Sequence, residues 1–138
     1  MVDLPKLGER QIIVDCDVIQ ADGGTRTAAI SGAWVALRIA VDRLLASKSL
    51  AADPIRTQVA AVSCGIHQGT AVLDLDYVED STAGSDGNFV LTADGAIVEA
   101  QLTAEGETFD EEGLLRLLRL ARIGCTDIFA AQLKATGR

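Results

Sequence analysis

The stretch Asp22-Gly23-Gly24-Thr25-Arg26-Thr27 joins a strand-like run over residues 11–19 to a helix-like run over residues 28–45. Two adjacent glycines allow a tight turn and a close approach of the backbone to a ligand. The N–H groups that open a helix have no partner within it, and the helix dipole adds positive potential there. Thr25 adds a hydroxyl, and Arg26 adds a planar cation that matches two phosphate oxygens. The stretch therefore predicts an anion site, with phosphate as the expected ligand.

The same residues also fit a plain glycine turn followed by a threonine N-cap and a solvated arginine. Short glycine-rich loops often match by chance, so the local pattern leaves both interpretations open. Two common phosphate loops are excluded. No Gly-Lys-Ser/Thr follows, as a Walker A loop requires, and the third glycine of a dinucleotide fingerprint is missing.

The composition is typical of a globular domain, and its net negative charge does not favour non-specific binding to nucleic acid. A length of 138 residues with 49% hydrophobic residues suits one folded domain. The formal net charge of −8 argues against non-specific nucleic-acid binding driven by overall charge. A small local phosphate site with its own cations remains compatible with that charge.

Cysteine usage and hydropathy indicate a cytoplasmic protein. Cys16, Cys64 and Cys125 are odd in number and widely spaced, which suits reduced thiols and provides no pair with metal-ligand spacing. The first residues are acidic and lack the long apolar run of a signal peptide, and no run is long enough to span a bilayer. We therefore expect no membrane association.

The first half of the chain predicts a strand followed by a helix. Alternating residues over Gln11–Ile19 predict a strand with one buried face. Apolar residues then recur at steps of three and four over residues 28–45, which predicts a helix. Its buried face includes Trp34, and we expect Arg38 and Asp42 as an ion pair on the opposite face.

The second half predicts two hairpins and a final helix. Their strands and turns are, in order, Thr57–Ile66, Gln68-Gly69 and Thr70–Tyr77, then Phe89–Thr92, Asp94-Gly95 and Ile97–Leu102. The Asp-Gly pair is a type I′ turn signal, and residues 81–87 are expected as a loop. Thr108 and Glu111 form a capping box for the last helix. The order is β-α-β-β-β-β-α, an α+β fold in one domain, residues 1–138.

A cluster of carboxylates provides a second candidate site. Asp74 and Asp76 lie two apart in an expected strand, so they share a face, and Asp80 follows just beyond it. Carboxylates that converge on one edge can bind Mg²⁺ through oxygen, and one carboxylic acid can protonate a leaving hydroxyl. The spacing alone also fits a solvated polar face.

Beyond these single motifs, several blocks resemble ribonuclease PH. They are Gly8-Glu9-Arg10, Ile13 through Ala28, Val59 through Ser63, Leu73 through Ser81, and Thr103 through Glu107. Their order and spacing match that family over nearly the whole chain. The resemblance implies a ribonuclease PH-like fold (ribosomal protein S5 domain 2-like). It also implies a phosphate-dependent 3′-exoribonuclease that trims tRNA precursors and releases nucleoside diphosphates, built as a hexameric ring of dimers.

The resemblance also implies roles for individual residues. The family's phosphate contacts fall on Gly24, Thr25 and Arg26, with inorganic phosphate as co-substrate. The carboxylates implicated in catalysis and Mg²⁺ binding fall on Asp74 and Asp80. The glycine loop and the acidic residues are thus expected to form one site for the 3′ end of RNA.

The chain departs from the family's pattern in three places. The family has a substantial segment before the Gly8-Glu9-Arg10 block, with strands that would pair with Gln11–Ile19, so we expect an N-terminally truncated fold with an exposed edge. Leu102 stands where the family usually has glycine, and Gly87 stands where it has a larger residue. The alternatives are a non-catalytic ring subunit or inactive fragment of the same fold, or an unrelated small phosphate-binding module.

Overall fold

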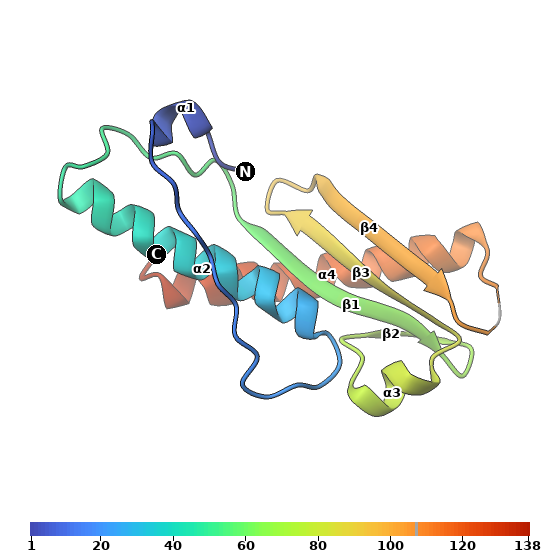
Figure 1. Cartoon of the computed structure of the whole chain (residues 1–138). Coiled ribbons are helices and arrows are strands. Elements are labelled where there is room, and N and C mark those ends of the chain that lie inside the picture. Colours follow the sequence, from blue (N-terminus) through green and yellow to red (C-terminus); the bar gives the residue numbers. More distant parts are fainter. Residues whose placement is uncertain (107) are drawn as a thin grey trace.

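The computed structural model describes residues 1–106 and 108–138, so Glu107, the last residue of one family block, lies outside the described part. Four strands form one antiparallel sheet in the order β2-β1-β3-β4 (Figure 1). The strands are β1 (Val59–His67), β2 (Thr70–Leu73), β3 (Ser85–Thr92) and β4 (Ile97–Ala104). The helices are α1 (Leu4–Leu7), α2 (Thr25–Ala46), α3 (Tyr77–Thr82) and α4 (Glu111–Ala135). The predicted α+β class is confirmed.

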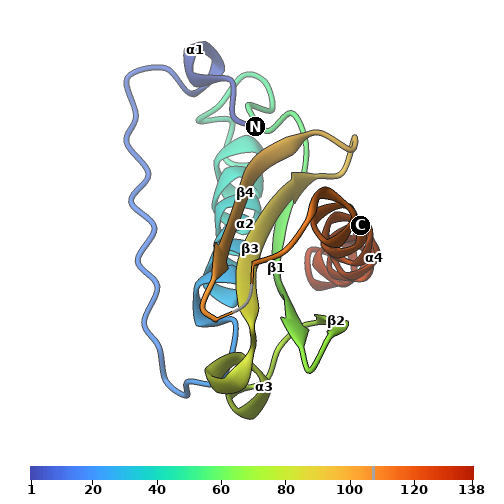
Figure 2. The same cartoon turned by 90° about the vertical axis from the view of Figure 1, so that its right-hand side faces the viewer.

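Helices α2 and α4 cover opposite faces of the sheet (Figure 2). The α4 side is filled by Ala60, Val62, Cys64, Phe89, Leu91, Leu117, Ala121 and Cys125. The α2 side holds a smaller cluster of Trp34, Val59, Ala61 and Val90. Trp34 is a core residue, as predicted, and its indole N–H donates to the Thr57 carbonyl at 3.2 Å. Within the described part of the chain, no helix combines the length and apolarity that crossing a bilayer requires.

The predicted strand over Gln11–Ile19 is wrong. The segment is extended but forms no strand, and Figure 2 shows it standing apart from the sheet. Most of its side chains are exposed, with Ile13 at 81% and Ile19 at 97%. Its start is anchored by Arg10, which donates to the carbonyls of Leu7 and Ser49. Further along, Ile12 is partly buried, and the Cys16 thiol donates to the Ala29 carbonyl at 3.9 Å. An alternating sequence forms a strand only where another strand pairs its N–H and C=O groups.

The second predicted strand is also too long. Strand β2 ends at Leu73, because Asp74 has a φ of 60° and turns the chain out of the sheet. Asp76 then caps α3, accepting a hydrogen bond from the Glu79 N–H in a capping box. Asp74 and Asp76 therefore do not share a strand face. Residues 81–87, expected as a loop, instead contain the end of α3 and the start of β3.

The turn assignments need one correction. Gln68 and Gly69 both have positive φ, 50° and 76°, as a type I′ turn requires. At Asp94-Gly95 only the glycine has positive φ, so the predicted type I′ turn is wrong there. The Gly95 N–H instead donates to the Thr92 carbonyl at 3.0 Å, which makes a longer loop.

Two charged or capping interactions differ from expectation. Arg38 does pair with Asp42, at 2.7 Å, but its side chain is only 3% exposed and also contacts Asp53 at 2.8 Å. The pair forms as predicted, but Arg38 is buried, while the side chains of Asp42 and Asp53 stay 35% and 40% exposed. Helix α4 is capped by Asp110, which accepts from the Gly113 N–H, so the predicted Thr108 capping box is wrong.

The two internal departures from the family pattern are neighbours in the sheet. Gly87 of β3 faces Leu102 of β4 in the strand register. A Cβ atom on Gly87 would lie 2.7 Å from the Leu102 Cδ1 atom and 2.5 Å from the Gln101 carbonyl oxygen. Leu102 therefore packs into space that a larger side chain at position 87 would need.

Candidate phosphate loop and carboxylate site

The face of the sheet under α2 changes from apolar to polar along the strands. Because side chains alternate between faces, Ser63 lies on the same face as Val59 and Ala61, and Asp86 lies on the same face as Val90. The apolar end is covered by Trp34. The polar end lies under the start of α2, where the predicted phosphate loop is.

The glycine loop is pressed against the chain that leads into α3. A Cβ atom on Gly23 would lie 1.9 Å from the Leu75 carbonyl oxygen, so only glycine fits there. Gly24 is the N-cap of α2, with a left-handed backbone (φ 69°, ψ 22°). A Cβ on Gly24 would lie 3.1 Å from the Ser63 hydroxyl, and no described side chain caps the helix. The first N–H groups of α2 thus keep their positive potential for an anion.

Asp22 ties this loop to α3. One of its carboxylate oxygens accepts hydrogen bonds from the Gly23 N–H and the Tyr77 N–H, each at 2.8 Å. These two backbone donors hold the pKa of Asp22 below its usual value. The carboxylate therefore stays ionised at neutral pH and fixes the phosphate loop next to the helix that carries Asp80.

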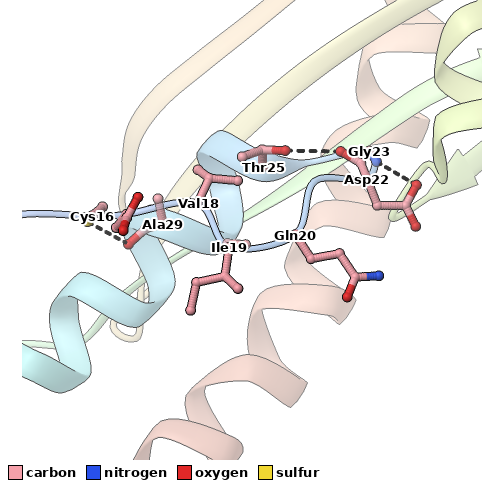
Figure 3. Close-up of a pocket in the computed structure, with 10 residues that line it drawn as sticks. Cys16, Val18, Ile19, Gln20, Asp22, Gly23, Thr25 and Ala29 are labelled. Carbon is pink, nitrogen blue, oxygen red and sulfur yellow. Dashed lines mark hydrogen bonds between the residues drawn. The ribbon is translucent and has the colours of Figure 1, made fainter.

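The predicted phosphate-binding side chains already have partners within the protein. The Thr25 hydroxyl donates to the Asp22 carbonyl at 3.0 Å. Both terminal nitrogens of Arg26 donate to the two carboxylate oxygens of Glu99 on β4, each at 2.8 Å. A cavity of about 430 Å³ lies between the first turns of α2 and the chain from Cys16 to Gln20. Figure 3 shows Thr25 among the residues that line it.

Asp74 lies on the other side of the glycine loop. It lines a cavity of about 330 Å³ together with Gly23, Gly24 and Asp127 of α4. Its backbone N–H donates to the Ser63 carbonyl at 2.8 Å, which holds this residue at the end of β2. The structure therefore brings Asp74 and the glycine loop to the same cavity.

Asp80 has different neighbours. It lies on α3, and partial burial together with the like charge of Asp86 on β3 raises its pKa. Among the described residues, no three histidine, cysteine or acidic side chains gather as a metal-binding group. Mg²⁺ commonly uses only one or two carboxylates, with water and phosphate oxygens completing its shell. A metal shared by Asp74 and Asp80 stays a prediction.

Three residues near the site were missed from sequence: Asp22, Asp86 and Glu99. Asp86 lay in the segment expected as a loop, although alternation continued back from Phe89 would have placed it on the α2 side of the sheet. Glu99 is 73 residues from Arg26, and Asp22 is 55 residues from Tyr77. No local pattern reveals contacts at such separations.

Comparison with known proteins shows what the chain is similar to. The model of the "3' exoribonuclease family, domain 2" matches residues 57–124. Proteins named ribonuclease PH from Cereibacter sphaeroides and Methylobacterium nodulans are each 57% identical over 99% of this chain. The chain spans only 57% and 58% of their respective lengths.

A structural relative is more distant in sequence. The crystal structure of rice (Oryza sativa) Rrp46 superposes with a TM-score of 0.69 at 16% identity, covering 87% of this chain and 51% of that one. This likeness confirms the fold alone. Together, the matches show that this chain is similar to ribonuclease PH over nearly its whole length, and that residues 57–124 match the second domain of the 3′ exoribonuclease family.

Proposed function

We propose that this chain provides the phosphate loop and the carboxylates of a phosphorolytic 3′-5′ exoribonuclease. The observation that carries the proposal is the docking of the uncapped start of α2 onto the segment that leads to Asp80. Gly23 allows the close approach and Asp22 holds it. The site thus combines an anion-binding helix end with carboxylates, which phosphoryl chemistry requires.

In this proposal Gly24, Thr25 and Arg26 hold inorganic phosphate. One phosphate oxygen attacks the phosphorus of the last phosphodiester, and the bond from that phosphorus to the 3′ oxygen of the preceding nucleotide breaks. The 3′ oxygen takes up a proton, and the terminal nucleotide leaves as a nucleoside diphosphate. The proposed substrate is the 3′ end of a tRNA precursor.

Asp74 and Asp80 are the proposed catalytic and Mg²⁺-binding carboxylates. The residues at Asp80 fit a divalent cation, because Asp86 is close enough to raise the Asp80 pKa and a cation would offset that repulsion. When bound, Mg²⁺ would neutralise charge that develops on the transferring phosphoryl group. Asp74, at the cavity beside Gly24, faces the loop from the other side.

A ring-forming assembly belongs to the same proposal. The similarity to proteins named ribonuclease PH supports this part of the proposal. The occupation of Arg26 by Glu99 favours a second candidate function, a non-catalytic ring subunit that keeps the fold without binding phosphate.

Phosphate titration by calorimetry tests the first function. Arg26→Ala is expected to weaken phosphate binding by about 1.5–3 kcal/mol, because a charge-assisted hydrogen bond is lost. Arg116→Ala is the matched control, since it removes another exposed arginine that pairs with a carboxylate, Glu112, at 2.6 Å. Equal affinity in the wild type and Arg26→Ala, or no binding by either, would leave the non-catalytic subunit as the better account.

The metal proposal is tested with Mn²⁺ as a paramagnetic probe. Asp80→Asn is expected to weaken Mn²⁺ binding about tenfold or more in an electron paramagnetic resonance titration, because a carboxylate ligand is removed. Asp74→Asn shows whether Asp74 shares the same ion. Glu111→Gln, a matched loss of one exposed carboxylate at the start of α4, is expected to change nothing. Unchanged Mn²⁺ affinity in both site variants would overturn the metal assignment.

A further inference from the structure

The arginine proposed to bind phosphate is held by a carboxylate of its own chain. Arg26 presents both terminal nitrogens to Glu99, and each donates at 2.8 Å to a different carboxylate oxygen. A guanidinium binds phosphate with this same bidentate geometry. Glu99 therefore occupies the position that two phosphate oxygens would take.

The Arg26 side chain points away from the cavities that the other residues of the glycine loop line. The neighbouring loop residues Gly23 and Thr25 line the cavity beside α2, and Gly23 and Gly24 line the cavity that contains Asp74. Arg26 borders neither of these cavities and instead reaches across to the edge strand β4. A phosphate held by the start of α2 would thus require the Arg26 side chain to leave Glu99.

The contact with Glu99 is of a kind that can exchange. The side chains of Arg26 and Glu99 are 51% and 36% exposed, so water reaches both groups. Ion pairs this exposed contribute little to stability, because solvent screens them and two long side chains must be ordered. Phosphate, with more negative charge than a carboxylate and the N–H groups of α2 behind it, is the stronger ligand for the same guanidinium.

We propose that Glu99 acts as an internal competitor for phosphate at Arg26. In the free protein its carboxylate occupies the guanidinium, and phosphate binding transfers Arg26 from Glu99 to the anion. Glu99 thereby lowers the apparent phosphate affinity of the loop and keeps Arg26 ordered when no phosphate is bound. The inference rests on the proposed function, since it assigns regulation to the same phosphate loop.

Glu99→Gln tests the competition directly, with inorganic phosphate as the ligand in calorimetry and ³¹P NMR line-broadening titrations. The variant removes the charge of the competitor and keeps its shape. We expect phosphate affinity to rise by about two- to fivefold, the range that corresponds to an exposed ion pair. Glu112→Gln is the matched control, because it removes one negative charge from another exposed arginine pair on α4 and leaves the loop untouched.

A double-variant cycle separates local competition from a general charge effect. In an Arg26→Ala background, Glu99→Gln is expected to have no effect on phosphate affinity, because the shared guanidinium is gone. The same rise in both backgrounds, or an equal rise with Glu112→Gln, would overturn the proposal.

Other outcomes distinguish this inference from the proposed function. Weaker binding in Glu99→Gln would make Glu99 a support for Arg26 and overturn the competition. If Arg26→Ala weakens binding while Glu99→Gln changes nothing, the inference fails and the phosphate loop stands. If neither the wild type nor Glu99→Gln binds phosphate at all, both fail.

Discussion

Strand β1 and the segment over residues 11–19 are both extended and both contain β-branched residues, but only β1 belongs to the sheet. Strand β1 pairs with β2 on one side and β3 on the other, and residues 59–65 are all buried. The segment over residues 11–19 pairs with no described strand and leaves Ile13 and Ile19 in solvent. The contrast shows that β-branched residues allow a segment to form a strand, and that a partner strand determines whether it does.

The largest difference that we expect between the extended segment and the sheet is in the rate at which their thiols react with a labelling reagent. Cys16 is exposed in the extended segment, whereas Cys64 of β1 and Cys125 of α4 are buried in the core between the sheet and α4. Burial raises the pKa of Cys64 to about 12 and that of Cys125 to about 11, so their reactive thiolate forms are scarce. We expect Cys16 to react with a thiol reagent at least about 10³-fold faster than the other two, which must wait for the core to open.

Rates are measured on native protein with an aromatic disulfide reagent, and the unfolded protein in urea is the control in which all three thiols react together. Equal rates in the native protein would mean that the core is open. A protected Cys16 would mean that another chain covers residues 11–19.

Truncating one side chain in each region compares their contributions to stability. Leu117 is fully buried in the α4-side core, so Leu117→Ala is expected to lower the free energy of unfolding by about 2–5 kcal/mol. Ile13 is 81% exposed, so Ile13→Ala is expected to change it by less than about 0.5 kcal/mol. Urea denaturation of the three proteins measures both effects. A large loss with Ile13→Ala would show that the extended segment is packed in solution.

Substituting Gly23 and Gly32 tests how closely the glycine loop contacts the chain that leads into α3. Gly23→Ala is expected to destabilise the protein by about 1–3 kcal/mol, because the new methyl group meets the Leu75 carbonyl. Gly32→Ala, within α2 and with no atom within 4 Å of the added methyl, is expected to stabilise it by about 1 kcal/mol. Thermal unfolding followed by circular dichroism gives both values, and destabilisation by both variants would contradict the close contact at Gly23.

Local patterns predicted much of the fold correctly. The existence of α2, which starts three residues earlier than predicted, follows from periodicity and glycine placement over a few residues, as do the burial of Trp34, the turn at Gln68-Gly69 and the central strands. The block pattern also identified the family. The predicted strand at residues 70–77 failed beyond Leu73 because a left-handed Asp74 and the Asp76 cap compete with strand pairing.

By itself, the sequence placed the glycine loop at the start of a helix and predicted an anion site there, because dipole, glycine and arginine are all local. Only the tertiary structure placed Asp86 beside Asp80, tied the loop to α3 through Asp22, and put Glu99 on Arg26. It alone left residues 11–19 without a partner. The reason is physical: pairing of strands and of charges depends on residues far apart in sequence, which no short window contains.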